Sequence, residues 1–450
     1  MVHDLYVLMI TAGVVSLLFK LMKQPVVLGY IVAGVLVGPY VLGDTWVDEG
    51  NVKAWGDVGV LFVLFCIGLE FRIKNLIQSG KVAAIGAVTI IGGMMLLGYC
   101  VGQWAGLDMM NSLFLAGMLC MSSTTIVMKA IDEAGQSKER FVRGATSILV
   151  IEDVVAVVLM VMLSSIAISH EFEGTELLSK IGVLALTLVI WFVFGILIIP
   201  TLLRKLKNYL NDETLIILAL GLCLGMVLTA EEAGFSSALG AFVMGSILAE
   251  TVESHRIEQM MTPMKNVFAA IFFVSVGMMI NPSNLVDYWS SILVVSVVIV
   301  LGMIFFGTLG CWLGGETMKD AMKTSFSFVQ IGEFSFIIAG LGTSLAVLDS
   351  RLYPIIVASS VVTTFLTPYI MKATIPCYNF LYNHAPAALR RKIDQREQEV
   401  NTQETSHQEE GQKSDTAFEN KIRRAVRYTF ITKRLVNLFI KNMSEKDKMQ

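Results

Sequence analysis

Long apolar stretches separated by short polar connections run along most of this chain. Thirteen stretches between residues 4 and 373 are each long enough to cross a hydrocarbon core of roughly 30 Å. Because every backbone amide inside lipid needs an internal partner, we expect them to be helices. The pattern therefore predicts an all-α polytopic membrane protein with about 13 transmembrane helices. The expected spans are 4–21, 25–42, 53–71, 82–104, 110–130, 142–168, 177–203, 213–231, 234–251, 264–281, 288–313, 319–346 and 352–373.

Composition supports a membrane protein and narrows the classes of function. Of 450 residues, 55% are hydrophobic and 16% are charged, whereas a soluble domain carries about 25% charged residues. The six cysteines form no CxxC pair, so neither a disulfide framework nor a zinc site is expected. No GxGxxG motif follows a strand pattern. We therefore expect no cofactor, no nucleic-acid partner and, because no nucleophile–base pattern is present, no enzyme activity.

The connections between spans alternate in charge. The odd-numbered ones are basic, as with Lys20 and Lys23 after the first span and Arg204 and Lys205 after the seventh. The even-numbered ones are acidic or nearly uncharged. Lys/Arg excess marks the cytoplasmic side. The pattern predicts an inner-membrane protein with its N-terminus outside and its C-terminus in the cytoplasm.

Two pairs of segments resemble each other. Residues 28–37 align with 239–248, and residues 67–76 align with 276–285. These matches relate span 2 to span 9 and span 3 to span 10, a shift of seven spans, which inverts the second copy in the membrane. Inverted repeats are typical of secondary transporters, although apolar helices also share Leu, Gly and Val by chance. The expected transmembrane domain, 1–376, divides into repeat one at about 4–168, a linker helix at 177–203 and repeat two at about 213–373.

Two adjacent acids, Glu152 and Asp153, lie in the middle of the sixth span. A charge at the bilayer centre costs several kcal/mol, so it normally faces a polar cavity and serves transport. Successive residues of a helix point about 100° apart, so the two carboxyl groups face different surroundings. A partly desolvated carboxylate binds either H⁺ or a monovalent cation. The alternative is a buried acid paired with Arg or Lys for packing alone.

Spans 5 and 12, partners in the proposed repeat, are polar at mid-depth. Hydroxyl groups at the midplane either line an ion path where a helix is interrupted or bond back to their own helix. Glu333 does not fit the second explanation, because a carboxylate in lipid needs stronger compensation. The candidate side chains are Ser122, Ser123, Thr124 and Thr125 in span 5 and Gln330, Glu333 and Ser335 in span 12.

The segment after the last span is polar and then basic. Residues 377–416 are expected to form a cytoplasmic linker. Residues 417–443 repeat apolar side chains at helical spacing among lysines and arginines, which predicts a basic amphipathic helix. Its expected partner, over 418–441, is anionic lipid, a separate regulatory subunit or the transmembrane domain.

Seven motifs together resemble the monovalent cation/proton antiporter superfamily, in its Kef-type and bacterial sodium–proton exchanger branch. They follow the order of that family over about residues 1–375. The motifs are Pro25–Tyr30 with Gly38-Pro39, Gly68-Leu69-Glu70, Ser122–Thr125, Glu152-Asp153, Gly234–Phe242, Phe272–Met278 and Gly332-Glu333-Phe334.

The resemblance implies a homodimer in which spans 5 and 12 are crossed, broken helices and Asp153 carries both the cation and the proton. It also implies alternating access by an elevator-like movement. Two departures concern the ion. No lysine lies within Val298–Phe305 of span 11, where many relatives have one. Glu152 replaces the Gln of potassium-type members and the Asp of many sodium-type members.

These observations predict antiport of K⁺ or Na⁺ against H⁺ through one site per protomer. Asp153 is the exchanged carboxylate that holds the monovalent cation, and Glu152 tunes its proton affinity or adds a ligand. Thr124, Thr125, Ser123 and Ser122 coordinate or gate, and Gln330, Glu333 and Ser335 support the site from the crossed helix. Two alternatives are a gated cation channel and a membrane sensor or scaffold with the antiporter fold.

Overall fold

Helices account for all the regular secondary structure in the described part of the chain. The computed structural model describes residues 2–22, 24–42, 47–70, 80–169, 174–206, 209–233, 235–388, 390–400 and 402. Within these ranges there is no strand, which confirms the expected all-α class. The transmembrane part belongs to one compact unit of residues 1–383, and residues 384–450 form a second unit.

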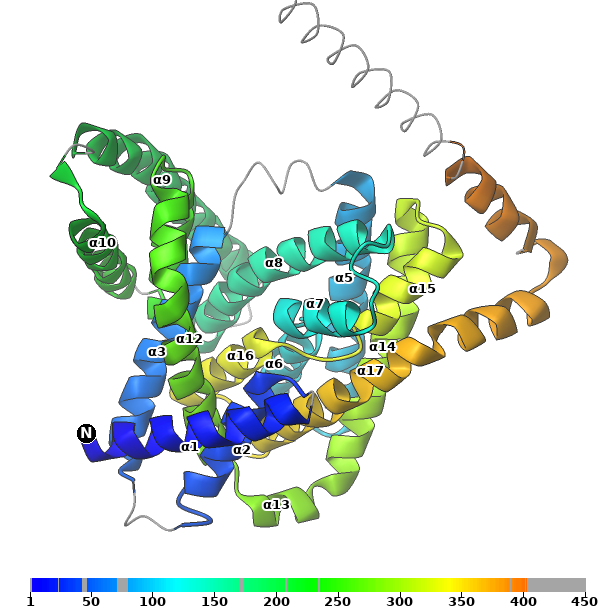
Figure 1. The fold of residues 1–450 in the computed structure, drawn as a ribbon, viewed down its shortest axis with the longest axis horizontal. Helices are drawn as coiled ribbons and strands as arrows, with labels where there is room; N and C mark the ends of the chain where they lie inside the picture. Colours follow the sequence, from blue (N-terminus) through cyan, green and yellow to red (C-terminus); the bar gives the residue numbers. More distant parts are fainter. Residues whose placement is uncertain are drawn as a thin grey trace, which may run out of the picture. The chain divides into compact units, whose positions relative to one another are not determined.

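The helices of the first unit pack mainly within two groups (Figure 1). The first group consists of α1 (Val2–Leu21), α2 (Val26–Val37), α3 (Glu49–Glu70), α10 (Asp212–Glu232), α11 (Ser237–Ala249) and α12 (Ser254–Met278). The second group consists of α5 (Gly80–Trp104), α6 (Met109–Leu119), α7 (Thr124–Glu133), α8 (Phe141–Ser169), α14 (Trp289–Gly314), α15 (Met318–Ser327) and α16 (Glu333–Ser344).

Three further helices complete the unit. The helix α9 (Gly174–Leu206) packs on α11 of the first group and on α8 of the second, and the short α13 (Pro282–Asp287) precedes α14. The last helix, α17 (Leu352–His384), is tied to α14 by a hydrogen bond from the Ser359 hydroxyl to the Ile292 carbonyl oxygen, at 3.3 Å.

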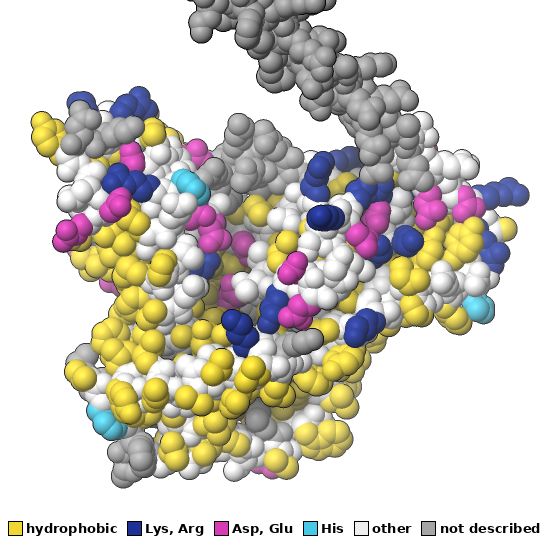
Figure 2. All heavy atoms as spheres, viewed as in Figure 1, with side chains coloured by type: hydrophobic (Ala, Val, Ile, Leu, Met, Phe, Trp, Pro, Cys, Tyr) yellow, Lys and Arg dark blue, Asp and Glu magenta, His cyan; other side chains and the backbone are white. Residues whose placement is uncertain are grey.

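The length and surface of the helices identify a membrane protein. Among the described residues, nine helices are long and apolar enough to cross a bilayer. Two further apolar helices, α2 and α11, have only 12 and 13 residues. Many large apolar side chains are exposed on α1, α5, α10 and α14. Figure 2 shows such side chains spread over much of one face, with charged groups gathered towards one end. That surface matches hydrocarbon rather than water.

Two of the expected spans are each interrupted near their middle. The span expected over 110–130 consists of α6 and α7, and the span expected over 319–346 consists of α15 and α16. The interruptions are residues 120–123 and 328–332. Ser123 caps α7 through its hydroxyl, and a hydroxyl at that position favours a helix start over a continuous helix.

Glycine contacts hold the first group together at two places. A Cβ added to Gly34 of α2 would lie 2.1 Å from the Val274 carbonyl oxygen of α12. A Cβ on Gly245 of α11 would lie 2.2 Å from the Phe65 carbonyl oxygen of α3. Only glycine allows such close backbone approach.

Helical structure continues past the expected end of the transmembrane domain. We expected the transmembrane domain to end at residue 376 and a polar linker to follow, but α17 continues to His384 and residues 390–400 are also helical. Arg, Lys, Gln and Glu dominate the latter stretch and are strong helix formers, and Arg396 pairs with Glu399 one turn later, at 3.4 Å. The amphipathic helix expected over 417–443 lies outside the described residues.

Candidate functional site

The two adjacent acids of the sixth expected span lie in the middle of the 29-residue helix α8. Glu152 is 1% exposed, whereas Asp153 is only partly buried. The difference follows from the angle of about 100° between successive side chains on a helix. Glu152 therefore points into the protein and Asp153 points towards a more accessible region.

Glu152 is anchored to the interruption between α6 and α7. Its Oε2 accepts a hydrogen bond from the backbone N–H of Ser122, at 3.0 Å. Its Oε1 is buried and has no hydrogen-bond partner among the described residues. The Ser122 hydroxyl donates to the Phe328 carbonyl oxygen at 3.4 Å, so Ser122 also links the first interruption to the second.

Asp153 contacts the first residue of α7. The Thr124 hydroxyl donates to Asp153 Oδ2 at 3.3 Å. The next residue, Thr125, is exposed on the same helix. A carboxylate and a hydroxyl placed together at the start of a helix offer the oxygen ligands that a hard monovalent cation requires.

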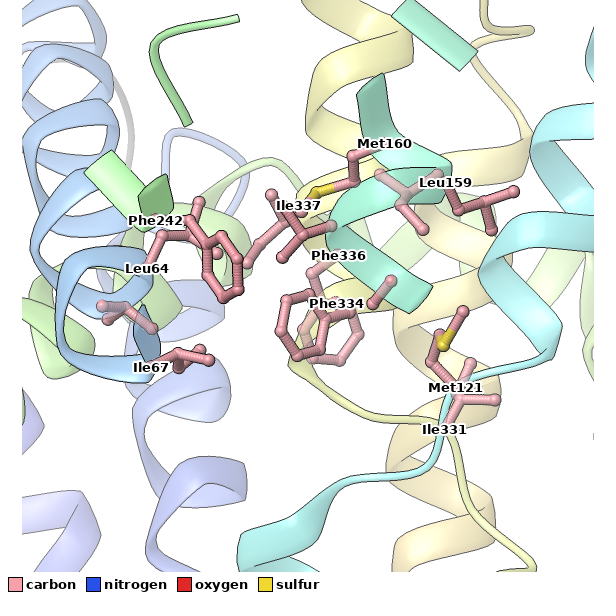
Figure 3. Packing of buried hydrophobic residues seen from close by; sticks show 14 of the residues in the cluster. Leu64, Ile67, Met121, Leu159, Met160, Phe242, Ile331, Phe334, Phe336 and Ile337 are labelled. Carbon is pink, nitrogen blue, oxygen red and sulfur yellow. The ribbon is translucent and has the colours of Figure 1, made fainter. Parts of the chain in front are cut away.

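The two interruptions cross and bond to each other. The Gly332 N–H donates to the Met121 carbonyl oxygen at 2.9 Å. The Gln330 amide and the Ser123 backbone exchange two hydrogen bonds, both at 3.3 Å. Figure 3 shows Met121 next to Ile331, where the two non-helical segments meet. These bonds satisfy backbone groups that lipid would leave unpaired.

Glu333 adds a third carboxyl group at the crossing. The Ser123 hydroxyl donates to Glu333 Oε2 at 3.2 Å. Glu333 is the first residue of α16, and Thr124 is the first residue of α7. Both helix N-termini carry partial positive charge, which stabilises nearby carboxylates. Ser335, in the first turn of α16, instead donates to the Met118 carbonyl oxygen at 2.5 Å, so its hydroxyl fastens α16 to α6.

An ion pair that the sequence did not predict lies on the first helix group. Lys265 Nζ of α12 is 2.7 Å from Glu70 Oε1 of α3. No motif in the sequence connected these two residues. The charge of Lys265 acts on Glu333, and that of Glu70 acts on both Glu333 and Asp153. The opposite signs at positions 70 and 265 were the only available signal of their pairing.

The three carboxyl groups at the crossing have no ion-pair partner in the described part of the chain. Among the described residues, no lysine or arginine forms an ion pair with Glu152, Asp153 or Glu333. The packing alternative for the acid pair required such a partner. A group of carboxyls in a low-dielectric setting favours bound protons or a bound cation over bare charges.

The fold and site define an integral membrane protein of the transporter class. The chain belongs to the sodium/hydrogen exchanger family, in its transmembrane region, and the match covers residues 6–375. The expected membership of the cation/proton antiporter superfamily is thus confirmed. The family and the relatives below are transporters, not enzymes.

Several known proteins are similar to this chain. The putative cation/proton antiporter YbaL of Escherichia coli (strain K12) is 28% identical, over 80% of this chain and 66% of its own length. The K(+)/H(+) antiporter subunit KhtU of Bacillus subtilis is 27% identical, over 85% of this chain and 95% of its own length. The Na(+)/H(+)-K(+) antiporter GerN of Bacillus cereus is 29% identical, over 78% of this chain and 90% of its own length.

A solved structure shares the fold. The sodium proton antiporter MjNhaP1 from Methanocaldococcus jannaschii superposes with a TM-score of 0.59, covering 82% of this chain and 94% of that one. Its sequence identity to this chain is 15%. The likeness therefore concerns the arrangement of helices and not the ion that is carried.

Proposed function

We propose that this chain exchanges a monovalent cation for H⁺ across the inner membrane, through one site per protomer centred on Asp153. The observation that carries the proposal is the position of the Asp153 carboxyl group. It is partly accessible, it contacts the Thr124 hydroxyl at 3.3 Å, and it lies where two interrupted helices cross. Such interruptions at mid-depth are typical of transport sites in secondary carriers.

Competition at Asp153 supplies the coupling. The carboxyl group binds either a proton or a cation. The low dielectric disfavours an ionised carboxylate without a cation, and it equally disfavours a cation beside a carboxyl group that is already protonated. Thr124 and Ser123 provide hydroxyl oxygens beside the cation. Glu152 and Glu333 set the negative potential, while Glu70 and Lys265 act on it from the first helix group.

Alternating access follows if the second helix group moves against the first. We infer thirteen spans in two inverted repeats, and the glycine contacts support this. Gly34 of α2 meets α12 as Gly245 of α11 meets α3. The two glycines occupy equivalent positions in the aligned segments 28–37 and 239–248. In an inverted repeat α2 corresponds to α11 and α12 corresponds to α3, so the α2–α12 contact and the α11–α3 contact are equivalent. The paired interruptions α6/α7 and α15/α16 follow the same relation.

The wider assembly completes the proposal. The chain forms a homodimer with its N-terminus outside and its C-terminus in the cytoplasm, and it serves pH homeostasis. One relative, KhtU, is described as an antiporter subunit, which supports a separate regulatory subunit; anionic lipid is the other proposed partner of 418–441. The named relatives include K⁺ and Na⁺ antiporters, so both ions stay candidates.

The test is cation-driven proton movement in proteoliposomes that contain an internal pH dye. K⁺, Na⁺ and Li⁺ are added in turn to wild type, Asp153→Asn and Glu213→Gln. Glu213 is an exposed acid in the first turn of α10, so its substitution controls for the loss of a carboxylate elsewhere.

One cation should collapse the pH gradient in wild type and in Glu213→Gln, while Asp153→Asn stays silent. Flux that saturates with cation and needs a counter-flow of protons supports a carrier. Flux that continues without proton movement would instead indicate a channel. Equal rates in wild type and Asp153→Asn would overturn the assignment of the site.

A further inference from the structure

A buried carboxyl group lies away from the transport site, in the short connection between α14 and α15. Glu316 follows Gly315, whose φ of 121° requires glycine, and precedes Thr317, which caps α15. Only 9% of Glu316 is exposed. Its Oε1 lies 2.2 Å from the point that a Cβ on Gly144 would occupy. The carboxyl group is therefore pressed against the first turn of α8, the helix that carries Asp153.

One oxygen of this carboxyl group is unpaired. Glu316 Oε2 has no hydrogen-bond partner among the described residues, and the same holds for the buried Thr324 hydroxyl of α15. The hydroxyl is nonetheless close enough to stabilise the ionised carboxylate, which opposes part of the effect of burial. Leaving an ionised carboxylate buried and unpaired is costly, so this environment favours a bound proton.

The surrounding charged and titratable groups come from three elements. Arg140, in the connection before α8, bonds Asp320 of α15 at 2.5 Å, and Cys311 comes from α14. The nearby Lys323 of α15 pairs with Glu139. Burial raises the pKa of Glu316 to about 7. Asp320 adds to this effect, whereas Arg140 and the Thr324 hydroxyl oppose it. From α5 the neighbour is the apolar Val82, which contacts both Gly144 and Gly314.

We propose that Glu316 is a second proton-binding site, which is not part of the transport path and sets the pH at which the antiporter is active. This inference rests on the proposed antiport function. When protonated, the carboxyl group is neutral and its O–H can be donated to the Thr324 hydroxyl. When ionised, it competes with Asp320 for Arg140. The two states therefore favour different positions of α15 relative to the start of α8.

The contacts connect this site with the acid pair. Thr324 lies one helical turn before Phe328, where α15 ends and the crossing begins. The Phe328 carbonyl oxygen accepts the Ser122 hydroxyl at 3.4 Å, and the Ser122 N–H is bound to Glu152 at 3.0 Å. A shift of α15 against α8 thus reaches the backbone that anchors Glu152.

The first measurement is the pH profile of cation-driven proton movement for wild type, Glu316→Gln and Glu316→Asp. The glutamine is isosteric with the protonated acid and does not titrate. Wild type should show a transition in rate near pH 7. Glu316→Gln should lose that transition and keep a maximal rate within about twofold of wild type, because its transport site is intact. Glu316→Asp should restore a transition, shifted by about one pH unit. An unchanged profile in Glu316→Gln would overturn the proposal.

The second measurement detects the proton without transport. Infrared difference spectra of the full chain between about pH 6 and about pH 8 report the carbonyl stretch of protonated carboxyl groups. Subtracting the Glu316→Gln spectrum from the wild-type spectrum should leave one carboxyl that ionises in this interval. No remaining band would refute proton binding at Glu316. If the wild type shows no cation-driven proton movement but the carboxyl band of Glu316 is present, proton binding at Glu316 is supported and the proposed antiport function is contradicted.

Discussion

The hydroxyl of Ser123 lies 3.2 Å from Glu333 Oε2 and accepts the N–H of Ile126 at 3.4 Å. These two bonds join the first turn of α7 to the first turn of α16, although 210 positions separate the residues. A single side chain therefore caps one interrupted helix and positions the carboxyl group that begins the other. The crossing is held by this contact together with the bonds of Gln330 and Gly332.

Removing the Ser123 hydroxyl should weaken cation binding. Ser123→Ala loses the cap of α7 and the bond to Glu333, at a cost of about 1 to 2 kcal/mol. We expect the apparent KM for the transported cation to rise by about tenfold, which corresponds to 1.4 kcal/mol. Cation titrations in proteoliposomes measure it. The control is Ser164→Ala, because the Ser164 hydroxyl bonds within its own helix, to the Val161 carbonyl oxygen at 2.9 Å. Equal KM values in both variants would contradict the role of Ser123.

Alanine at Gly34 and alanine at Gly245 should destabilise the protein to a similar degree. Each new Cβ would overlap a backbone oxygen, at 2.1 Å and 2.2 Å, and overpacking typically costs about 1 to 3 kcal/mol. Thermal unfolding in detergent measures the loss as a lower Tm. Gly92→Ala on α5 is the control, because nothing lies within 4 Å of its Cβ position. A large effect at only one of the two sites would speak against the inverted-repeat relation.

Neutralising Glu70 and neutralising Lys265 should change cation affinity in opposite directions. Lys265→Gln removes a positive charge that acts on Glu333, and Glu70→Gln leaves that charge unpaired. We expect the apparent KM to fall about threefold in Lys265→Gln and to rise about threefold in Glu70→Gln, within the roughly 1 kcal/mol that a partly exposed pair contributes. Arg351→Gln, at an ion pair with Asp349, serves as the control. Changes of the same sign would show that the pair is structural only.

As the pH rises towards 7, the free energy of unfolding of the wild type should fall relative to that of Glu316→Gln. The pKa of Glu316 is raised from 4.5 to about 7 by burial, so between these values the folded chain holds a proton that the unfolded chain has lost. Stability from this group is therefore complete below about pH 4.5 and is lost as pH rises through about 7. The full change is at most about 3 kcal/mol. Tm against pH for both proteins measures it, and parallel curves would contradict the raised pKa.

Asp349 provides a control of opposite sign. Arg351 donates hydrogen bonds to its carboxylate and holds the pKa of Asp349 below the usual 3.8. Its stabilising contribution is therefore present above pH 3.8 and is lost as the pH falls below that value. We expect the difference in Tm between wild type and Asp349→Asn to stay constant between about pH 5 and about pH 8. A slope in that interval would show that the Glu316 effect is not specific.

Some of the site was predictable because it rests on local chemistry. Glu152 and Asp153 are conspicuous in an apolar helix, since a charge in lipid is costly wherever the helix packs. Hydroxyls at 122–125 left two explanations open, and the interruptions of spans 5 and 12 were expected from the family resemblance. The positions of the helices followed from hydropathy, but the lengths of α2 and α11, and the continuation of α17 to His384, did not.

The sequence by itself determined that this is a helical membrane protein with acids and hydroxyls inside its apolar segments, because each of these features depends on the transfer of single residues from water to lipid. Only the tertiary structure decided which of them meet. It placed Ser123 on Glu333, Lys265 on Glu70 and the Glu316 carboxyl group on Gly144. Such pairs are up to 210 positions apart. They form because particular helices pack closely against each other, and the residue pattern along a single helix does not predict which helices these are.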